Sequence, residues 1–427
     1  CDPAKENLTE NKIKKYVPNY QEKSICLHNS FENLLDDGGF DAIYFCIPPS
    51  LHQGELMSAA EAGIHLFVEK PVSLFLDEAL KMREVIERNK IIATVGFNQR
   101  HDNWHIGIRD FVRNKRLIMM TVIVNGTLES HSVKHTKTET VGGPPNRVWA
   151  ANRSWSGGTI VEAGIHQTDL MRFWAGDIEW VEAHYVHRDE KDIADGGDNP
   201  YAYSVTYGFA NGMIAHLSMS RLRKTFWGDS YDDIIWDRGH LKLEHDGPVA
   251  YYYDGPYPTD SPIEPETLRH PLNLGQRNNN TLEINRAFIE AVGKQSEDPL
   301  LNTFSSSINS HAAVLGANIS DELKRSMDYL GSKSDTAFLG QAVACKGTAM
   351  RNTLLDVCQS KLIEMPVCEE LQMGMTNGMA INGTIPISIY PRWNFLLLAV
   401  HFDLLELLIY VVFWRFHVKL VLLCLIF

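Results

Sequence analysis

The sequence has little of several features that would assign a function class directly. Its seven cysteines are odd in number and scattered, and they show neither the spacing of a metal site nor a paired disulfide framework. Positive charge is scarce, since 40 Lys and Arg against 53 Asp and Glu give a formal net charge of -13. This balance disfavours nucleic acid and anionic membrane surfaces as partners. Internal repeats and low-complexity linkers are also absent. The 427 residues leave room for two domains and an extension.

A glycine-rich phosphate turn is missing as well, because no G-x-G-x-x-G occurs in residues 1–40. The next segments nevertheless predict half of a dinucleotide-type fold. Three apolar runs, 41–47, 64–69 and 91–96, read as buried strands, and residues 51–63 and 76–89 carry apolar residues at helical spacing. Near-continuous apolar strands that alternate with helices predict a parallel sheet covered on both faces.

The start of the chain fits this fold only in part. A dinucleotide fold needs a first strand and a glycine turn before this point, so we expect a fragment that lacks roughly its first 30 residues. Cys1-Asp2 reads as the end of a strand. Asp2 then stands where an acidic residue binds ribose hydroxyls, about 20 residues past the glycines. The alternative is that Asp2 only begins a turn before Pro3.

The tripeptide Glu69-Lys70-Pro71 closes the second apolar run. It places a carboxylate and an ammonium at the carboxyl end of a predicted parallel strand, where the ligand crevice of such sheets opens. A bond that precedes proline is also one of the few kinds that is cis at modest cost. The tripeptide therefore predicts a functional lysine at the sheet edge.

A second cluster runs from Trp155 through Gly157-Gly158 to Trp174. In it Glu162 and His166 are four residues apart and Asp169 is three further on, so all three lie along one stripe of a helix. Titratable groups on a stripe flanked by apolar residues face a pocket or are paired inside the core. The three together, after a Gly-Gly turn, favour a functional site.

These motifs resemble those of the Gfo/Idh/MocA oxidoreductases. Cys46 to His52 resembles the family's strand-end Thr-Pro-Asn-x-x-His, with Ile47 and Pro49 in place of Thr and Asn, and Glu69-Lys70-Pro71 is its hallmark. The segment 96–100 resembles Gly-Tyr-x-x-Arg, and 157–169 resembles the family's Gly-Gly-Gly-x-x-x-Asp-x-x-x-His-x-x-Asp helix. Glu162 replaces the usual Asp there, and Thr159 the third Gly. The similarity covers residues 1 to about 330.

The resemblance implies an N-terminal nicotinamide-binding domain and a C-terminal domain with a large, mostly antiparallel sheet. It implies that Lys70 reaches the reacting hydroxyl, that His166 takes or relays its proton, and that Glu162 orients the ring or binds substrate. The implied cofactor-binding residues are Asp2, Ile47, Pro48, His52, Glu69, Lys70 and Asn98. Those implied for substrate binding are Lys70, Arg100, Glu162, His166 and Asp169. No metal site is expected.

Two properties of these groups bear on the chemistry. A neutral imidazole, with an ordinary pKa of about 6.5, is a natural base near neutral pH. The longer Glu162 arm displaces its carboxylate relative to Asp, and positioning errors of ~1 Å can lower rates ~100-fold, which leaves substrate choice and activity open. Alternatively, Lys70, Glu69 and Glu162 form an ion-pair cluster that holds the domains together.

The middle of the chain predicts the second domain. Residues 201–220 alternate in polarity and turn at Asn211-Gly212, which is a strong hairpin signal. The segments 234–236, 241–243 and 250–253 are further strand candidates. Cys46 is expected in a buried strand as a small apolar residue, and His101 and His105 are expected to be an exposed or packing pair. We expect assembly of a homo-oligomer through the antiparallel sheet.

The last hundred residues fit the family least. From about Leu330 to Pro391 few patterns stand out, and residues 394–427 are intensely hydrophobic. A membrane-spanning helix needs about 20 mostly apolar residues, but charged residues interrupt the tail: its longest stretch without Asp, Glu, Lys, Arg or His is eight residues, 420–427. A poor membrane anchor, an oligomer-forming helix and out-of-frame translation remain open, and an error in the gene model is favoured.

The sequence thus predicts an α/β protein: a truncated Rossmann-type domain (1–118), an α+β substrate and oligomerisation domain (119–330), and an unassigned extension (331–427). The expected activity is NAD(P)-dependent hydride transfer to or from a hydroxyl-bearing carbon of a sugar or cyclitol. NAD is preferred over NADP because Asp2 would repel a 2′-phosphate. Alternatives are an NAD-dependent glycoside hydrolase, a non-catalytic nucleotide- or sugar-binding relative, and a membrane-tethered accessory protein. We expect a cytoplasmic location, with tethering by residues 395–427 as the alternative.

Overall fold

A computed structural model describes residues 1–2, 5–20, 25–127, 148–195, 197–222, 229–255, 264–390 and 421–424. The chain divides into two compact units, Cys1–Asn318 and Ile319–Phe427. Most of the hydrophobic tail predicted at 394–427 lies outside the described residues. Within the described ranges, no helix combines the length and apolar content that crossing a membrane requires.

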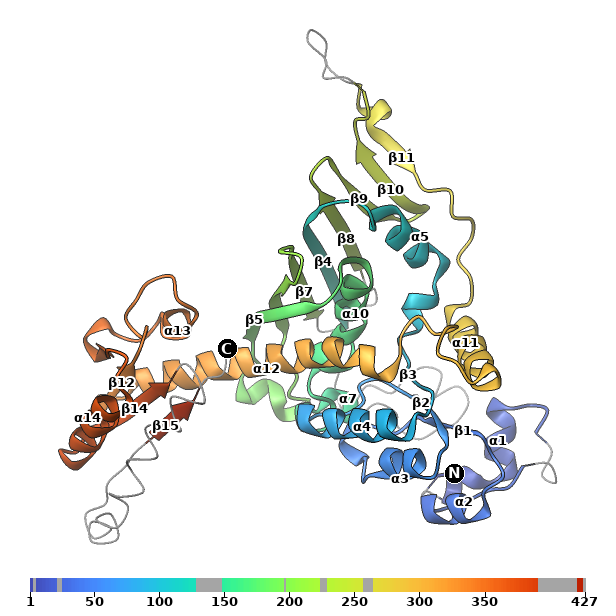
Figure 1. Cartoon of the computed structure of the whole chain (residues 1–427), viewed down its shortest axis with the longest axis horizontal. Coiled ribbons are helices and arrows are strands. Elements are labelled where there is room, and N and C mark those ends of the chain that lie inside the picture. The colour runs from blue at the N-terminus through green and yellow to red at the C-terminus, as the bar shows by residue number, and fades with distance from the viewer. Residues whose placement is uncertain are drawn as a thin grey trace. The chain divides into compact units, whose positions relative to one another are not determined.

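The first unit opens with a parallel three-stranded sheet in the order β1-β2-β3 (Figure 1). Its strands are β1 (Ala42–Phe45), β2 (His65–Val68) and β3 (Ala93–Val95). The helices of this region are η1 (Lys5–Leu8), α1 (Glu10–Tyr16), α2 (Phe31–Asp37), η3 (Pro49–Leu51), α3 (Glu55–Glu61), α4 (Leu76–Asn89), η4 (Asn98–His101) and α5 (Asn103–Val112). The three predicted strands and both predicted helices are therefore confirmed. Cys1 and Asp2 belong to no strand, contrary to expectation.

Strand β2 shows why this sheet is covered on both faces. All four of its residues are buried, and their side chains alternate between the two faces. Leu66 and Val68 belong to the large core that includes residues of α3 and α4, whereas Phe67 packs edge-on against Phe288 of α11 (Asn280–Lys294) at 5.6 Å. Cys46 follows the end of β1 and is exposed, so the prediction that it is buried is wrong.

The second part of this unit is built on an eight-stranded sheet in the order β11-β10-β9-β8-β4-β7-β6-β5. Only the β4–β7 pair is parallel. The strands are β4 (Leu117–Thr127), β5 (Ile178–Val186), β6 (Ala202–Phe209), β7 (Ile214–Leu222), β8 (Asp229–Trp236), β9 (Gly239–Glu244), β10 (Gly247–Tyr252) and β11 (Arg269–Pro271). The β6–β7 hairpin turns at Asn211-Gly212. Strands β8 and β9 contain the predicted segments 234–236 and 241–243, and β10 contains all of the predicted segment 250–253 except its last residue. The large, mostly antiparallel sheet is therefore confirmed.

Helix α10 (Gly164–Ala175) packs on one face of this sheet, against β4 and β7. The short helices α7 (Val148–Ala151), α8 (Arg153–Ser156) and α9 (Thr159–Glu162) precede it in the chain, and η5 (Glu190–Asp195) and η6 (Pro265–Leu268) lie in the connections. In β6, Tyr203, Val205 and Tyr207 are buried, and the Tyr207 hydroxyl lies 2.9 Å from that of Thr168 in α10. Assembly through this sheet stays a prediction.

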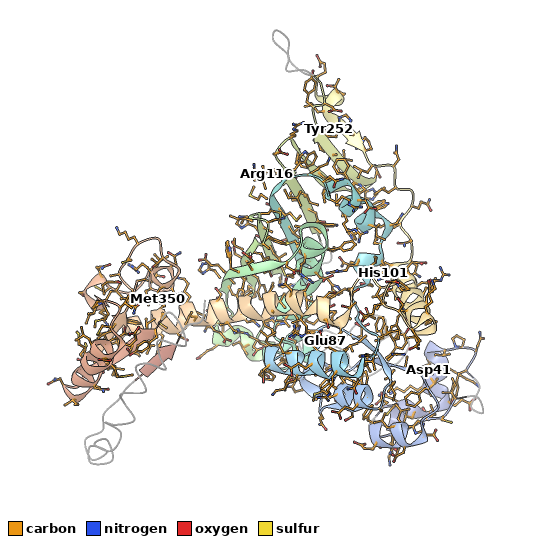
Figure 2. The ribbon with its side chains drawn as sticks, in the orientation of Figure 1. Asp41, Glu87, His101, Arg116, Tyr252 and Met350 are labelled. Carbon is orange, nitrogen blue, oxygen red and sulfur yellow. The ribbon has the colours of Figure 1, made fainter. Side chains whose placement is uncertain are left out.

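Helix α12 (Phe304–Ser332) runs through the boundary between the units, and the second unit has its own parallel sheet in the order β13-β12-β14-β15. Its elements are β12 (Thr336–Gly340), α13 (Ala349–Asn352), η7 (Gln359–Lys361), β13 (Leu362–Glu364), α14 (Glu369–Ile381), β14 (Ile385–Tyr390) and β15 (Val421–Cys424). Phe338, Ile387 and Ile389 are fully buried with Met350, which Figure 2 labels. The segment after Leu330 thus forms an α/β unit that sequence patterns did not reveal.

Candidate functional site

The predicted lysine stands at the carboxyl edge of the small sheet. The backbone of Glu69 donates to the carbonyl of Phe45 at 2.9 Å, and Gly96 donates to that of Val68 at 2.8 Å, so the ends of the three strands are level. Beyond this edge the chain continues as the loops that carry Lys70, Ile47 and Asn98. The Lys70–Pro71 peptide bond is cis. Three predicted binding segments therefore share one edge.

Lys70 reaches across to the helices on the large sheet. Its Nζ donates to the backbone carbonyl of Glu162 at 2.5 Å and to Oε1 of the same residue at 3.1 Å. Both side chains are largely buried, with 13% and 11% exposed. An ammonium has three N–H donors, and within the described residues no third acceptor lies within hydrogen-bond distance of Nζ. One donor of Lys70 is thus left for a ligand.

His166 lies one helical turn after Glu162. A break at Ala163 separates α9 from α10, but Ala163 keeps right-handed helical angles, so the predicted stripe is maintained. The imidazole is half-buried and packs edge-on against the ring of Phe97, which follows β3, with centroids 6.5 Å apart. The stripe therefore faces the segments that leave the small sheet.

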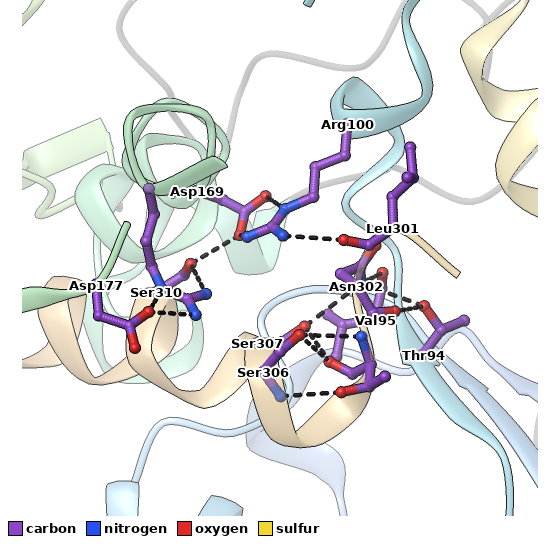
Figure 3. A network of polar contacts seen from close by, with 12 residues as sticks. Thr94, Val95, Arg100, Asp169, Asp177, Leu301, Asn302, Ser306, Ser307 and Ser310 are labelled. Carbon is purple, nitrogen blue, oxygen red and sulfur yellow. Dashed lines mark hydrogen bonds and ion pairs between the residues drawn. The ribbon is translucent and has the colours of Figure 1, made fainter. Parts of the chain in front are cut away.

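Asp169, the third residue of the stripe, is bound by Arg100. Figure 3 shows the two side chains joined by a pair of hydrogen bonds, each 2.7 Å long, from Nε and Nη2 to the two carboxylate oxygens. Ser310 of α12 donates to the same carboxylate at 2.7 Å, and Arg100 also donates to the carbonyl of Leu301 at 3.1 Å. Arg100 is 6% exposed and Asp169 is 2% exposed. This geometry gives both residues a structural role, and substrate binding by either stays a prediction.

The remaining predicted residues are spread around the edge. Asn98 donates to Thr281 at 3.1 Å and to Asn280 at 3.4 Å, both at the start of α11. The Glu69 carboxylate packs so closely on Gly96 that a Cβ there would lie 2.8 Å from its Oε2.

Ile47 and Pro48 are half-buried just past β1. Burial lowers the pKa of His52, with Glu55 and Glu78 opposing the shift. Asp2 accepts a hydrogen bond from the side chain of Asn7 at 2.9 Å. The cofactor roles of all these residues stay predictions.

Two outcomes concern residues outside the predicted site. His101 and His105 are both buried, which confirms packing over exposure; His105 lies against Trp174. Within the described ranges, no cluster of three His, Cys, Asp or Glu side chains is arranged to hold a metal. Sequence reasoning missed Ser310, because it reaches Asp169 from 141 residues away and no local motif marks it.

Known proteins match the chain in two blocks. Residues 1–97 match a family model described as an oxidoreductase family with an NAD-binding Rossmann fold, and residues 126–239 match one described as the GFO/IDH/MocA C-terminal domain.

Curated relatives are 24–31% identical over the matched part. They include an uncharacterized oxidoreductase of Bacillus subtilis (28% identity; 57% of this chain, 66% of that protein). Two others are the myo-inositol 2-dehydrogenase of Thermotoga maritima (27%; 49% and 58%) and the scyllo-inositol 2-dehydrogenase (NAD(+)) of B. subtilis (31%; 35% and 40%). The chain thus spans less than two thirds of the length of these relatives.

Solved structures share the fold at lower identity. The WlbA dehydrogenase of Bordetella pertussis, in complex with NADH and UDP-GlcNAcA, has a TM-score of 0.56 at 15% identity. The matched region covers 75% of this chain and 87% of the WlbA chain. Levoglucosan dehydrogenase, in complex with NADH and levoglucosan, has a TM-score of 0.54 at 16% identity, with 69% and 81% covered. At these identities the likeness establishes the fold alone.

Proposed function

Because the chain belongs to the Gfo/Idh/MocA family of NAD-binding oxidoreductases, we propose that it transfers a hydride between a nicotinamide cofactor and a hydroxyl-bearing carbon of a sugar or cyclitol. Relatives with inositol dehydrogenase names support this substrate class. The observation that carries the proposal is Lys70, held by two contacts from Glu162 at the carboxyl edge of a parallel sheet with one N–H donor left over.

The polar groups at this edge are of the chemical types that can hydrogen-bond to a dinucleotide. The Glu69 carboxylate, the His52 imidazole and the Asn98 amide offer polar contacts on loops where open parallel sheets bind their ligands. A bound nicotinamide would supply the hydride acceptor. NAD is preferred over NADP because the Asp2 carboxylate would repel a 2′-phosphate.

The chain's own residues then account for the proton chemistry. Lys70 donates a hydrogen bond to the substrate oxygen and stabilises alkoxide character as it develops. His166 accepts the hydroxyl proton as a neutral imidazole. Glu162 holds the Lys70 ammonium through two hydrogen-bond acceptors, so the lysine side chain is already ordered before substrate binds.

Replacement of Lys70 by Ala tests the proposal. NAD reduction would be followed at 340 nm with a panel of inositols and aldoses, and the affinity for NADH would be measured by fluorescence titration. We expect kcat/KM to fall at least ~100-fold, as for loss of a group that acts at the reacting atom, with NADH binding retained. Arg88→Ala, which removes an exposed cation paired with Glu61, is the control. Unchanged turnover in Lys70→Ala would refute the mechanism.

A further inference from the structure

His311 of α12 is a buried titratable residue that the proposed mechanism does not use. It is 2% exposed and lines a narrow space that has no room for a water molecule. Among the described residues around this space, Ser307 is the only other one with a polar side chain, and its hydroxyl donates to the carbonyl of Thr303 at 2.7 Å. Because buried polar atoms are normally hydrogen-bonded, we expect the imidazole to have a partner on the backbone.

The backbone of Ser73 is the group that the imidazole meets. Burial lowers the pKa of His311 to about 4, and hydrogen bonding to the Ser73 backbone opposes this shift. A partner that favours the protonated ring accepts a hydrogen bond from it, so the group is the Ser73 carbonyl. Neither ring nitrogen makes a hydrogen bond of normal distance and angle to a described residue, so this contact is longer or more bent than usual. Near pH 7 the neutral ring has one N–H to direct at this carbonyl.

Ser73 belongs to the loop that carries Lys70, between β2 and α4. It follows Lys70 by three residues and is fully buried. Its hydroxyl donates to the carboxylate of Glu78 in α4 at 2.7 Å and accepts from the backbone N–H of Phe75 at 3.0 Å. The loop is therefore tied to α4 through the hydroxyl of this serine and meets α12 through its carbonyl.

The same part of α12 also contacts the surroundings of His166. Ser310, the residue before His311, donates to the carboxylate of Asp169 at 2.7 Å, and Asp169 lies on the helical stripe of His166. Phe97, whose ring packs against the His166 imidazole, lines the narrow space beside His311. Two consecutive residues of α12 thus meet the lysine loop and the histidine helix of the proposed site.

We propose, on the basis of the function proposed above, that His311 is a positioning residue. It holds the loop at Ser73 and so sets the place of the Lys70 ammonium relative to the His166 imidazole. Because His311 is buried, it touches neither substrate nor cofactor. Misplacement of a catalytic group by ~1 Å can lower the rate ~100-fold. Loss of the imidazole N–H should therefore lower kcat more than it lowers the affinity for substrate or cofactor.

Substitutions that remove or keep an N–H at position 311 test this role. His311→Leu removes it, and His311→Phe takes its place should the leucine variant fail to fold. His311→Gln and His311→Asn keep an amide N–H, near the places of Nε2 and Nδ1. The matched control is Phe209→Leu, which alters a side chain of β6 in the large sheet that is also 2% exposed. Each variant would be assayed for kcat, KM and NADH affinity, and the exchange of its backbone amides would be measured by mass spectrometry.

We expect kcat of His311→Leu to fall about 10- to 100-fold with unchanged NADH affinity, and the amides of residues 72–75 to exchange faster. One of the two amide variants should restore both values, and Phe209→Leu should keep both. Unchanged kcat or unchanged loop exchange in His311→Leu would overturn the inference, as would an equal response of the control or no recovery in either amide variant. If the wild type did not reduce NAD, the proposed function would fail, and loop exchange would still decide whether His311 holds Ser73.

Discussion

Replacement of Asp169 by Ala tests the structural role of the Arg100–Asp169 pair. The change leaves a guanidinium that is 6% exposed without its two 2.7 Å carboxylate contacts, and it removes the acceptor of the Ser310 hydroxyl. Removal of one partner from a buried ion pair destabilises a protein by about 3–5 kcal/mol, because the other charge stays buried and unpaired. Since native domains are stable by only about 5–15 kcal/mol, this is a large fraction of the total.

The assay is urea unfolding, followed by circular dichroism and tryptophan fluorescence, with the free energy of unfolding taken from the midpoint and slope. Glu61→Ala is the comparison, because it breaks the Arg88–Glu61 pair, whose side chains are 64% and 59% exposed. Exposed pairs contribute about 0–1 kcal/mol. We expect Asp169→Ala to exceed Glu61→Ala by at least ~2 kcal/mol.

The double variant Arg100→Leu, Asp169→Leu separates the unpaired charge from lost packing. Since it leaves neither charge buried, it should be more stable than Asp169→Ala alone. If Asp169→Ala lost less than ~1 kcal/mol, or if the double variant were the less stable of the two, the pair would not be a structural ion pair. Loss of turnover with unchanged stability would instead favour the predicted role in substrate binding.

Two further predictions concern stability. Burial lowers the pKa of His311 to about 4, whereas a His in the unfolded chain has a pKa of ~6.5. As the pH falls, the unfolded state therefore binds this proton before the folded state does. The free energy of unfolding should decrease between about pH 6.5 and 4, by up to ~3 kcal/mol. Urea unfolding from pH 7.5 to 4.5 should show a flatter pH dependence in His311→Phe than in the wild type, and parallel curves would contradict this. Gly239→Ala in β9 should destabilise by ~1–3 kcal/mol, because its Cβ would lie 2.3 Å from the backbone oxygen of Tyr251, which cannot rotate away as a flexible side chain can. Gly293→Ala in α11, where a Cβ meets nothing within 4 Å, should instead stabilise by ~0.5–1 kcal/mol; equal melting temperatures for the two variants would refute the packing argument.

The sequence was most informative where periodicity is local. The helix predicted at 76–89 has the bounds of α4, and Asn211-Gly212 marked the β6–β7 turn correctly. Glu162, His166 and Asp169 could be placed on one stripe from their spacing alone. The pairing of Lys70 with Glu162 was expected only as an alternative, and that of Arg100 with Asp169 was not expected, because both pairings depend on how distant segments pack.

The same limit applies to the second unit and to Cys46. The strand at 336–340 has only three apolar residues at its centre, between Thr336 and Gly340, so its sequence gives no clear strand pattern. Its burial depends on contacts with the distant residues Ile387 and Ile389. Cys46 continues an apolar run in the sequence, yet β1 ends at Phe45 and the next side chain is exposed. Where a strand stops is decided by hydrogen-bonded pairing, which composition does not record.

The two ion pairs also have a consequence for folding kinetics. Lys70 and Glu162 are 92 residues apart in the chain, and Arg100 and Asp169 are 69 apart. Contacts of such long sequence separation form only after large loops have closed, which slows folding. The carboxylates of α9 and α10 would therefore find their cations late, after both sheets have begun to assemble. Substitutions at these pairs should then act mainly on the rate of unfolding, with little effect on the rate of folding.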